Sequence, residues 1–201
     1  MMKTELVVAT KNKGKLREIR ELLKGFDLKI ASLADYPDAP HIIEDGKNFA
    51  QNAIKKAATI ALYTKKLTLG EDSGIEVKAL GHEPGIHSAR FSGPNATDQK
   101  NNAKLLRLLK DVPDHKRQAR YQCFAALIDG HAIVDVVSGQ CSGRITRHAR
   151  GKNGFGYDPY FLIVRYGKTF GELDPVVKAR ISHRARAMRK IKQSIRKYLK
   201  A

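Results

Sequence analysis

Two adjacent carboxylates stand in the short stretch from Gly70 to Gly74, where Glu71 and Asp72 precede Ser73. Apolar residues come before this stretch and an alternating pattern resumes after it, which predicts two short strands joined by a glycine-flanked break. Oxygen ligands suit Mg²⁺, which keeps several waters and takes one or two protein carboxylates plus substrate phosphates. A solvated turn explains the same residues, so the stretch alone leaves both interpretations open.

A second polar group follows the first apolar run and covers Thr10 to Lys15. A strand, a glycine-containing loop and a helix N-terminus form a natural phosphate site, because free backbone N–H groups point into the loop. Thr10 and Asn12 add neutral donors, and Lys15 adds a positive charge. The loop is not a Walker A motif, since Gly14 and Lys15 are followed by leucine. A basic solvated loop is the alternative.

Glu44 lies just before a predicted helix over residues 48–63. On this helix Asn52 and Lys56 are four residues apart and therefore share a face. Glu44 is placed either to cap the helix or to point into a metal site.

A glycine-rich stretch from Gly151 to Pro159 holds two aromatic residues, Phe155 and Tyr157. Glycine lets a ligand approach the backbone closely, and aromatic faces stack on nucleobases. The alternative is a hairpin loop whose aromatic side chains pack inward.

The rest of the chain alternates predicted strands and helices. We expect a strand at 6–9, a helix that ends at Gly25, strands at 28–31 and 75–80, a helix at 98–110, a hairpin of 119–129 with 132–140, strands at 143–146 and 160–165, and helices from Pro175 and over 182–200. The last helix carries an apolar stripe expected to face the core: Ala185, Met188, Ile191, Ile195 and Leu199.

Length and composition favour one globular domain over residues 1–201, with two lobes. No apolar run is long enough to span a bilayer, and the short apolar run near the N-terminus does not fit a signal peptide. The two cysteines, Cys123 and Cys141, are expected to be reduced and buried, which indicates an intracellular, cytoplasmic protein. A disulfide between them stays open.

The net charge of +18 favours polyanionic partners: nucleic acid, membrane surface or phosphorylated small molecules. The last part of the chain, from Lys178 to Ala201, holds ten Lys or Arg and no Asp or Glu. We interpret this basic helix mainly as a solvated face; non-specific adhesion to nucleic acid or to a membrane surface are the other options.

Taken together, these stretches resemble the noncanonical purine NTP pyrophosphatases, the inosine/xanthosine triphosphate pyrophosphatase family. The resemblance covers nearly the whole chain in order. Its motifs are Ala9 to Lys15, Glu44 with Gly46, Phe49, Asn52-Ala53 and Lys56, Glu71 to Gly74, Pro84 to Arg90, Gly154 to Pro159, and Lys178 with Ser182-His183-Arg184.

The resemblance implies an α/β fold, with an elongated central mixed β-sheet flanked by helices and an active-site cleft between two lobes. It implies Mg²⁺-dependent hydrolysis of ITP, dITP and XTP to the monophosphate and pyrophosphate, by a homodimer that cleanses the nucleotide pool. The implied roles are as follows: Thr10, Asn12, Lys15 and Lys56 hold the triphosphate; Glu44 and Asp72 bind Mg²⁺; Asp72 is also the base for the attacking water; Ser73 touches substrate; and Phe155, Gly156, Tyr157, Asp158, Lys178, His183 and Arg184 surround the purine.

The chain departs from the family pattern at Asn48, Gln51 and Ala149, and in the strength of its C-terminal positive charge. Two other hypotheses stay open: a nucleic-acid-binding protein, suggested by the charge, and a phosphatase of the same fold that acts on modified pyrimidine nucleotides. No recognised DNA- or RNA-binding motif supports the first. The Ser182-His183-Arg184 motif favours the purine enzyme over the second.

Overall fold

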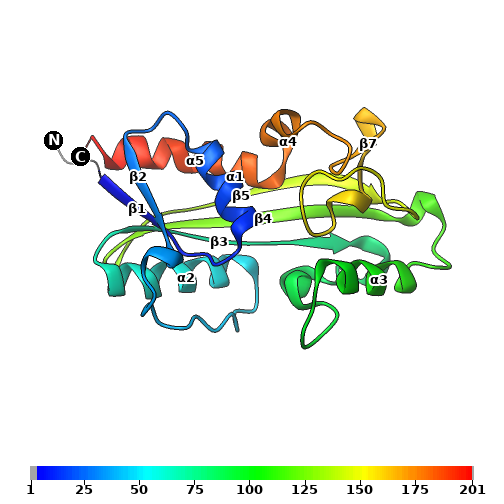
Figure 1. Cartoon of the computed structure of the whole chain (residues 1–201), viewed down its shortest axis with the longest axis horizontal. Helices are drawn as coiled ribbons and strands as arrows, with labels where there is room; N and C mark the ends of the chain where they lie inside the picture. Colours follow the sequence, from blue (N-terminus) through cyan, green and yellow to red (C-terminus); the bar gives the residue numbers. More distant parts are fainter. Residues whose placement is uncertain (1–3, 201) are drawn as a thin grey trace. The chain divides into compact units, whose positions relative to one another are not determined.

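Figure 1 shows the computed structural model of the chain, which describes residues 4–200. The strands are β1 (Thr4–Val8), β2 (Leu28–Ser32), β3 (Leu67–Val77), β4 (Gln118–Asp129), β5 (Ala132–Ile145), β6 (Phe161–Ile163) and β7 (Lys168–Thr169). The helices are α1 (Lys13–Leu22), α2 (Phe49–Thr64), α3 (Asp98–Leu108), α4 (Pro175–Ile181) and α5 (His183–Tyr198). Short 3-10 helices cover Leu33–Asp35, Lys78–Leu80, Gly85–Arg90, Asp114–Lys116, Asp158–Tyr160 and Val164–Tyr166.

The strands form a sheet in the order β2-β1-β3-β4-β5-β6-β7. β1 pairs in parallel with both β2 and β3, whereas β6 is antiparallel to β5 and to β7. The expected α/β class, with a mixed sheet and flanking helices, is therefore confirmed. Within residues 4–200, no helix is long and apolar enough to cross a membrane.

The chain divides into two compact units. The described part of unit 1 comprises residues 4–72, 123–139 and 184–200, and unit 2 comprises residues 73–122 and 140–183.

Unit 1 has a layer of helices on each face of its strands. Alternate side chains of a strand point to opposite faces, so Leu6 and Val8 face one side and Val7 the other. The first side packs against α1 and α5, through residues such as Ile19, Met188 and Ile191. The other side packs against α2, through Ile60 and a row of alanines: Ala53, Ala57 and Ala61.

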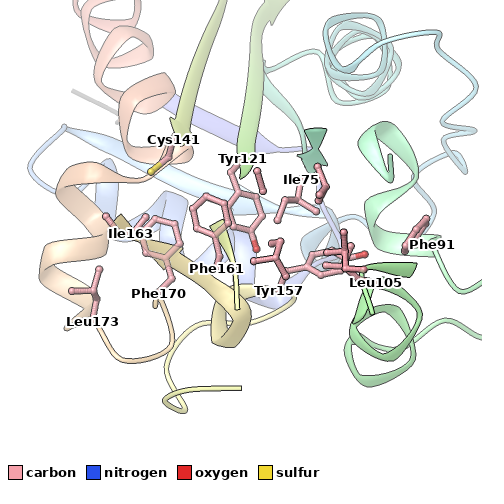
Figure 2. Packing of buried hydrophobic residues seen from close by; sticks show 14 residues of the cluster. Ile75, Phe91, Leu105, Tyr121, Cys141, Tyr157, Phe161, Ile163, Phe170 and Leu173 are labelled. Carbon is pink, nitrogen blue, oxygen red and sulfur yellow. The ribbon is translucent and has the colours of Figure 1, made fainter. Parts of the chain in front are cut away.

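Unit 2 has its own core of aromatic and aliphatic residues, shown in Figure 2. Tyr121 lies at its centre, with its ring centroid 4.6 Å from that of Phe161 and 6.2 Å from that of Phe170. Helix α3 contributes Leu105, and Tyr157 from the glycine-rich stretch is also part of this core.

Several predicted boundaries were wrong. The glycine-flanked break does not exist, because β3 runs without interruption from Leu67 to Val77 and ends in a 3-10 helix at 78–80. The separate strand at 143–146 is the end of β5, and the strand at 160–165 shrinks to β6 between two 3-10 helices. Four members of the apolar stripe on α5 are buried, but the fifth, Leu199, is 41% exposed.

Candidate active site

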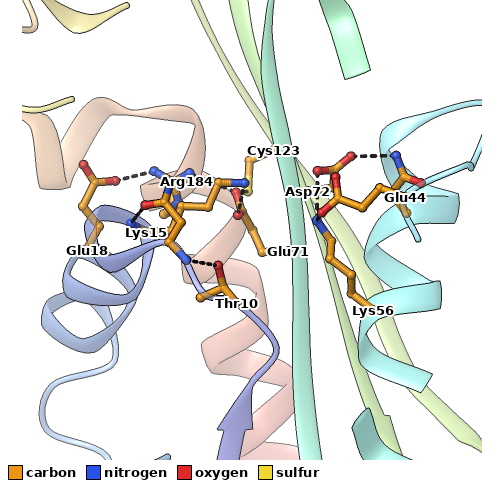
Figure 3. A network of polar contacts seen from close by, with 11 residues as sticks. Thr10, Lys15, Glu18, Glu44, Lys56, Glu71, Asp72, Cys123 and Arg184 are labelled. Atoms are coloured by element: carbon orange, nitrogen blue, oxygen red, sulfur yellow. Dashed lines mark hydrogen bonds and ion pairs between the residues drawn. The ribbon is translucent and has the colours of Figure 1, made fainter. Parts of the chain in front are cut away.

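The continuous course of β3 separates the two neighbouring carboxylates. Because consecutive side chains of a strand point to opposite faces, Glu71 and Asp72 enter two different polar networks (Figure 3). Both carboxylates are nearly fully buried, with exposed fractions of 2% and 4%. The solvated-turn interpretation is therefore wrong, because the stretch is a buried part of a continuous strand. Buried charges persist only when they are paired, so each carboxylate needs partners.

Glu71 faces α1 and α5. Its carboxylate lies 3.0 Å from the Lys15 ammonium and accepts a hydrogen bond of 3.0 Å from the Arg184 guanidinium. The thiol of Cys123 on β4 donates to the same carboxylate at 3.2 Å. Burial disfavours the ionised form of Glu71, but Arg184, Lys15 and Lys56 outweigh this effect and hold its pKa well below its usual range. Glu71 is therefore an ionised carboxylate that is paired with neighbouring cations.

Arg184 also binds a second carboxylate. Its guanidinium donates to Glu18 on α1, so it links α5 to α1 and to β3 (Figure 3). The side chain is 1% exposed. The resemblance groups Arg184 with the residues around the purine, whereas its terminal nitrogens bind two acids of unit 1.

The loop before α1 is shaped by its own polar residues. The Asn12 side chain accepts a hydrogen bond from the backbone N–H of Lys15 at 2.9 Å and so caps α1. Thr10 accepts from the N–H of Asn12 at 3.1 Å. β1 ends at Val8, beside Leu69 of the parallel strand β3, so the loop lies at the carboxyl end of the parallel pair. Ligands of α/β proteins bind at such ends.

Asp72 faces helix α2 on the other side of the sheet. The Lys56 ammonium lies 3.0 Å from Asp72 and 2.9 Å from Glu44, so it bridges the two carboxylates. The amide of Asn52 donates to Asp72 at 3.1 Å, while its oxygen accepts from the N–H of Gly46 at 2.8 Å. Glu44 does not cap α2, because Asn48 does. One face of α2 therefore holds Asp72 and the loop that carries Glu44.

Burial shapes the charge state of this second network. Burial raises the pKa of Asp72 above its usual value, and the cations Lys56 and Lys15 only partly offset it. Burial also disfavours charge on Lys56, but Asp72 and Glu44 prevail and raise its pKa, so the ammonium stays protonated. Asp72 is thus a more basic carboxylate than its neighbour Glu71, which is the property that a general base needs.

Small residues bring α2 close enough for these contacts. A Cβ atom added at Gly70 would lie 2.2 Å from the backbone oxygen of Ala53 and 2.6 Å from the backbone nitrogen of Ala57. Such distances leave no room for any side chain. Gly70 thus sets the separation of β3 and α2, and with it the reach of Asn52 and Lys56 to Asp72.

Gly70→Ala should destabilise the protein by about 1–3 kcal/mol, because the added methyl group collides with backbone that cannot move aside cheaply. The midpoint of urea unfolding measures this loss. The matched control is Gly167→Asn, at a site with open space around the Cβ position and a left-handed backbone that asparagine tolerates. Equal losses in the two variants would contradict the close-packing explanation.

The carboxylates of this second network are the candidate ligands for a metal ion. Among residues 4–200, no group of three or more His, Cys, Asp or Glu side chains is arranged to hold one. Glu44 and Asp72 nevertheless share one cation, the Lys56 ammonium, at 2.9 and 3.0 Å, so both can approach the same positive charge. Two hard carboxylate oxygens fit Mg²⁺, which completes its shell with water and substrate phosphates.

The predicted purine-contacting residues of unit 2 form a compact group of their own. Asp158 is buried, accepts a hydrogen bond from the Phe155 N–H at 2.9 Å, and lies 2.5 Å from the Lys178 ammonium. Lys178 in turn lies 5.1 Å from the centre of the half-buried Phe155 ring. A Cβ at Gly154 would meet Asp158 at 2.0 Å, so this loop closes tightly around the carboxylate.

Two further members of this set are less accessible. Tyr157 is 5% exposed and donates its hydroxyl to the Ser88 carbonyl at 2.8 Å, so its ring packs inward and leaves only its backbone for a ligand. The His183 ring stacks on Tyr121 with centroids 4.5 Å apart. Ser73 and Gly156 are partly exposed. Ring stacking on a base is therefore open to Phe155, whereas the ring of Tyr157 follows the alternative of inward packing.

Sequence reasoning missed Glu18 and Cys123, and gave Asn52 no site role. Glu18 follows Lys15 by three residues, a spacing that places both on one helical face and was available as a signal. Nothing in the sequence indicates that Cys123, which is 52 residues after Glu71 in the chain, would reach its carboxylate. Both Cys123 and Cys141 are buried and neither is in a disulfide, as expected.

Comparison with known proteins gives a consistent result. The Ham1 family signature matches residues 6–194. A dITP/XTP pyrophosphatase of Desulforamulus reducens is 46% identical over 186 residues, which is 92% of each chain. One from Shouchella clausii is 47% identical and covers 95% of this chain and 96% of its own. The structure of a HAM1 protein from Coxiella burnetii superposes with a TM-score of 0.87 at 38% identity, over 96% of this chain and 99% of that one.

Proposed function

Because the chain belongs to the Ham1 family, we propose that it hydrolyses noncanonical purine nucleoside triphosphates such as ITP, dITP and XTP to the monophosphate and pyrophosphate. The activity would keep deaminated purines out of DNA and RNA. One observation carries the proposal: the Lys56 ammonium bridges the carboxylates of Asp72 and Glu44, and Lys15 is near enough to lower the pKa of Asp72. Carboxylates and lysines gathered in this way suit the cleavage of a charged phosphoanhydride.

The triphosphate would bind at the loop before α1. Lys15 contributes positive charge, and the capped N-terminus of α1 contributes its dipole. Thr10 and Asn12 keep the loop in a fixed shape through their hydrogen bonds to its backbone. Lys56 adds a second positive charge on the other face of β3. Glu71 holds Lys15 in place, so the phosphate-binding charge does not depend on a mobile lysine.

Asp72 would orient the attacking water and accept its proton. Its raised pKa favours proton acceptance, and the Asn52 amide holds one of its oxygens at 3.1 Å so that the carboxylate cannot rotate freely. Glu44 and Asp72 are the residues that would hold Mg²⁺. When bound, Mg²⁺ supplies charge neutralisation at the phosphates. No side chain is needed as a nucleophile, since phosphoryl transfer to water depends on positioning and electrostatics.

Recognition of the base is assigned to unit 2. Phe155 is the candidate for stacking, and Lys178, His183 and the backbone of residues 156–158 are candidates for polar contacts, together with Ser73. A 6-keto purine accepts hydrogen bonds at O6, whereas the amino group of adenine would leave the same donors unpaired, which is where polar sites discriminate most strongly. Arg184 stays among the candidates for contacts to the purine, and through Glu71 it also positions Lys15, because its guanidinium binds both Glu71 and Glu18.

Three finer points belong to the same proposal. We propose that the enzyme depends on Mg²⁺, that it is a homodimer, and that it acts in the cytoplasm on the nucleotide pool. Sedimentation of the purified protein tests the second point, and treatment with EDTA followed by addition of Mg²⁺ tests the first.

The decisive experiment identifies the products. Purified protein with Mg²⁺ and a panel of ITP, XTP, dITP, ATP, GTP and modified pyrimidine triphosphates should release pyrophosphate from the first three, far faster than from the others. Anion-exchange chromatography separates pyrophosphate from orthophosphate. Release of orthophosphate alone would exclude the proposal, and a preference for the pyrimidine nucleotides would favour the second enzyme hypothesis instead.

A further inference from the structure

Three basic residues of α1 follow the helical period. Lys13, Arg17 and Arg20 are spaced four and three residues apart, and Lys24 follows just after the end of the helix at Leu22; all four are exposed. At 100° per residue the three helical residues lie within an arc of about 60° and form one line, which Lys24 extends. The acids of this segment lie outside that line: Glu18 is turned to Arg184, and Glu21 lies 3.9 Å from Lys24.

Helix α5 carries a second line of the same kind. Arg189, Lys192 and Arg196 are spaced three and four residues apart, Lys200 follows just after the end of the helix at Tyr198, and the helix contains no Asp or Glu. Arg189, Arg196 and Lys200 are exposed and Lys192 is partly exposed. At 100° per residue the three helical residues occupy an arc of about 60°. We call the two lines together the basic stripes.

The two stripes lie on helices that touch. The Lys192 ammonium lies 5.8 Å and the Arg196 guanidinium 5.2 Å from the ring centre of Phe26, which follows α1. Residues of both helices pack in the same core, and Figure 1 shows α1 lying against α5. Two rows of positive charge are therefore held side by side on one unit, by contacts that do not involve the site around Asp72.

A surface rich in one sign of charge attracts polyanions, and a row of cations matches a row of phosphates. We propose that the basic stripes bind the phosphodiester backbone of nucleic acid without regard to sequence. Neither stripe contributes a side chain to which the proposed pyrophosphatase activity gives a role, so this binding function is independent of that activity.

The structure favours nucleic acid over a lipid surface. An amphipathic helix binds a bilayer by burying its apolar face among the acyl chains. The apolar face of α5 is already occupied, since Ala187, Met188, Ile191 and Ile195 are 0% exposed inside the core of unit 1. What α5 presents outward is polar and mostly basic, which fits a polyanion in solution.

Fluorescence anisotropy with a labelled 30-nucleotide single-stranded RNA and a labelled 30-base-pair DNA duplex tests the proposal. About six phosphate contacts predict that log K falls with log[NaCl] at a slope of about −4 for the single strand and about −5 for the duplex. The triple variant Arg17→Glu, Arg20→Glu and Arg196→Glu should weaken binding at least about tenfold at 50 mM NaCl and flatten the slope by about 2–3.

The matched control is Lys78→Glu, Lys116→Glu and Lys168→Glu, which changes the net charge equally at exposed lysines of unit 2. It should lose less than about threefold in affinity. Both triple variants should keep nucleotide hydrolysis, which also shows that they are folded. Equal losses in the two variants, no binding to either probe at 50 mM NaCl, or binding to phosphatidylserine vesicles in place of nucleic acid would each overturn the proposal.

Discussion

Asp72→Asn should lower kcat for pyrophosphate release from ITP by about 10²–10⁴-fold, the usual contribution of a positioned general base. Asparagine keeps the size of the side chain and an acceptor oxygen for Lys56, but it cannot accept the proton of the attacking water. It also weakens the oxygen pair that Glu44 and Asp72 would offer to Mg²⁺. Initial rates under saturating ITP measure the effect, and circular dichroism should show an unchanged fold.

The control for this variant is Asp45→Asn. Asp45 lies one residue after Glu44 and pairs with Lys55 at 2.7 Å, but its side chain is 63% exposed. The same chemical change at that position should leave kcat within about twofold, because exposed ion pairs contribute little. A near-normal kcat in Asp72→Asn would show that Asp72 is not the general base, whatever the kcat of the control variant.

Arg184→Met should destabilise the protein by about 3–5 kcal/mol, since it leaves the carboxylate of Glu71 buried with one of its main cations missing. For a chain of this size, 1 kcal/mol corresponds to about 2–4 °C in Tm, so the expected fall in Tm is about 6–20 °C. Urea unfolding at neutral pH gives the free energy directly. The loss should fall mainly on stability, and the folded fraction should bind ITP more weakly because Glu71, which holds Lys15, loses its contact with Arg184.

Two further variants separate ion pairing from packing. Arg186→Met makes the same substitution at an exposed position of α5 and should change stability by less than about 1 kcal/mol. The double variant Arg184→Met with Glu71→Gln removes the orphaned charge as well, and should be more stable than Arg184→Met alone. If the double variant were the less stable of the two, the loss would come from packing and not from the buried carboxylate.

Patterns within single segments were sufficient to predict much of the fold. The apolar run of β1, the helical spacing on α1 and α2, and the turn at Asp129-Gly130 all depend on neighbouring residues, and the corresponding elements form. The mistakes came where local signals competed with tertiary pairing. Glycines at 70 and 74 suggest a break, but β3 passes through both, because Gly70 is needed for the close approach of α2 and not for a turn.

The amino-acid sequence by itself determined which chemical groups this protein has and roughly which elements carry them: the lysine-bearing loop before α1, the carboxylates on β3, and the polar face of α2. Only the tertiary structure decided how these groups are distributed between the two polar networks. The two-residue period of a strand turns Glu71 toward Lys15 and Arg184, and Asp72 toward Lys56 and Glu44. Their different surroundings, more than their identical chemistry, make one a fixed anchor for cations and the other the candidate base.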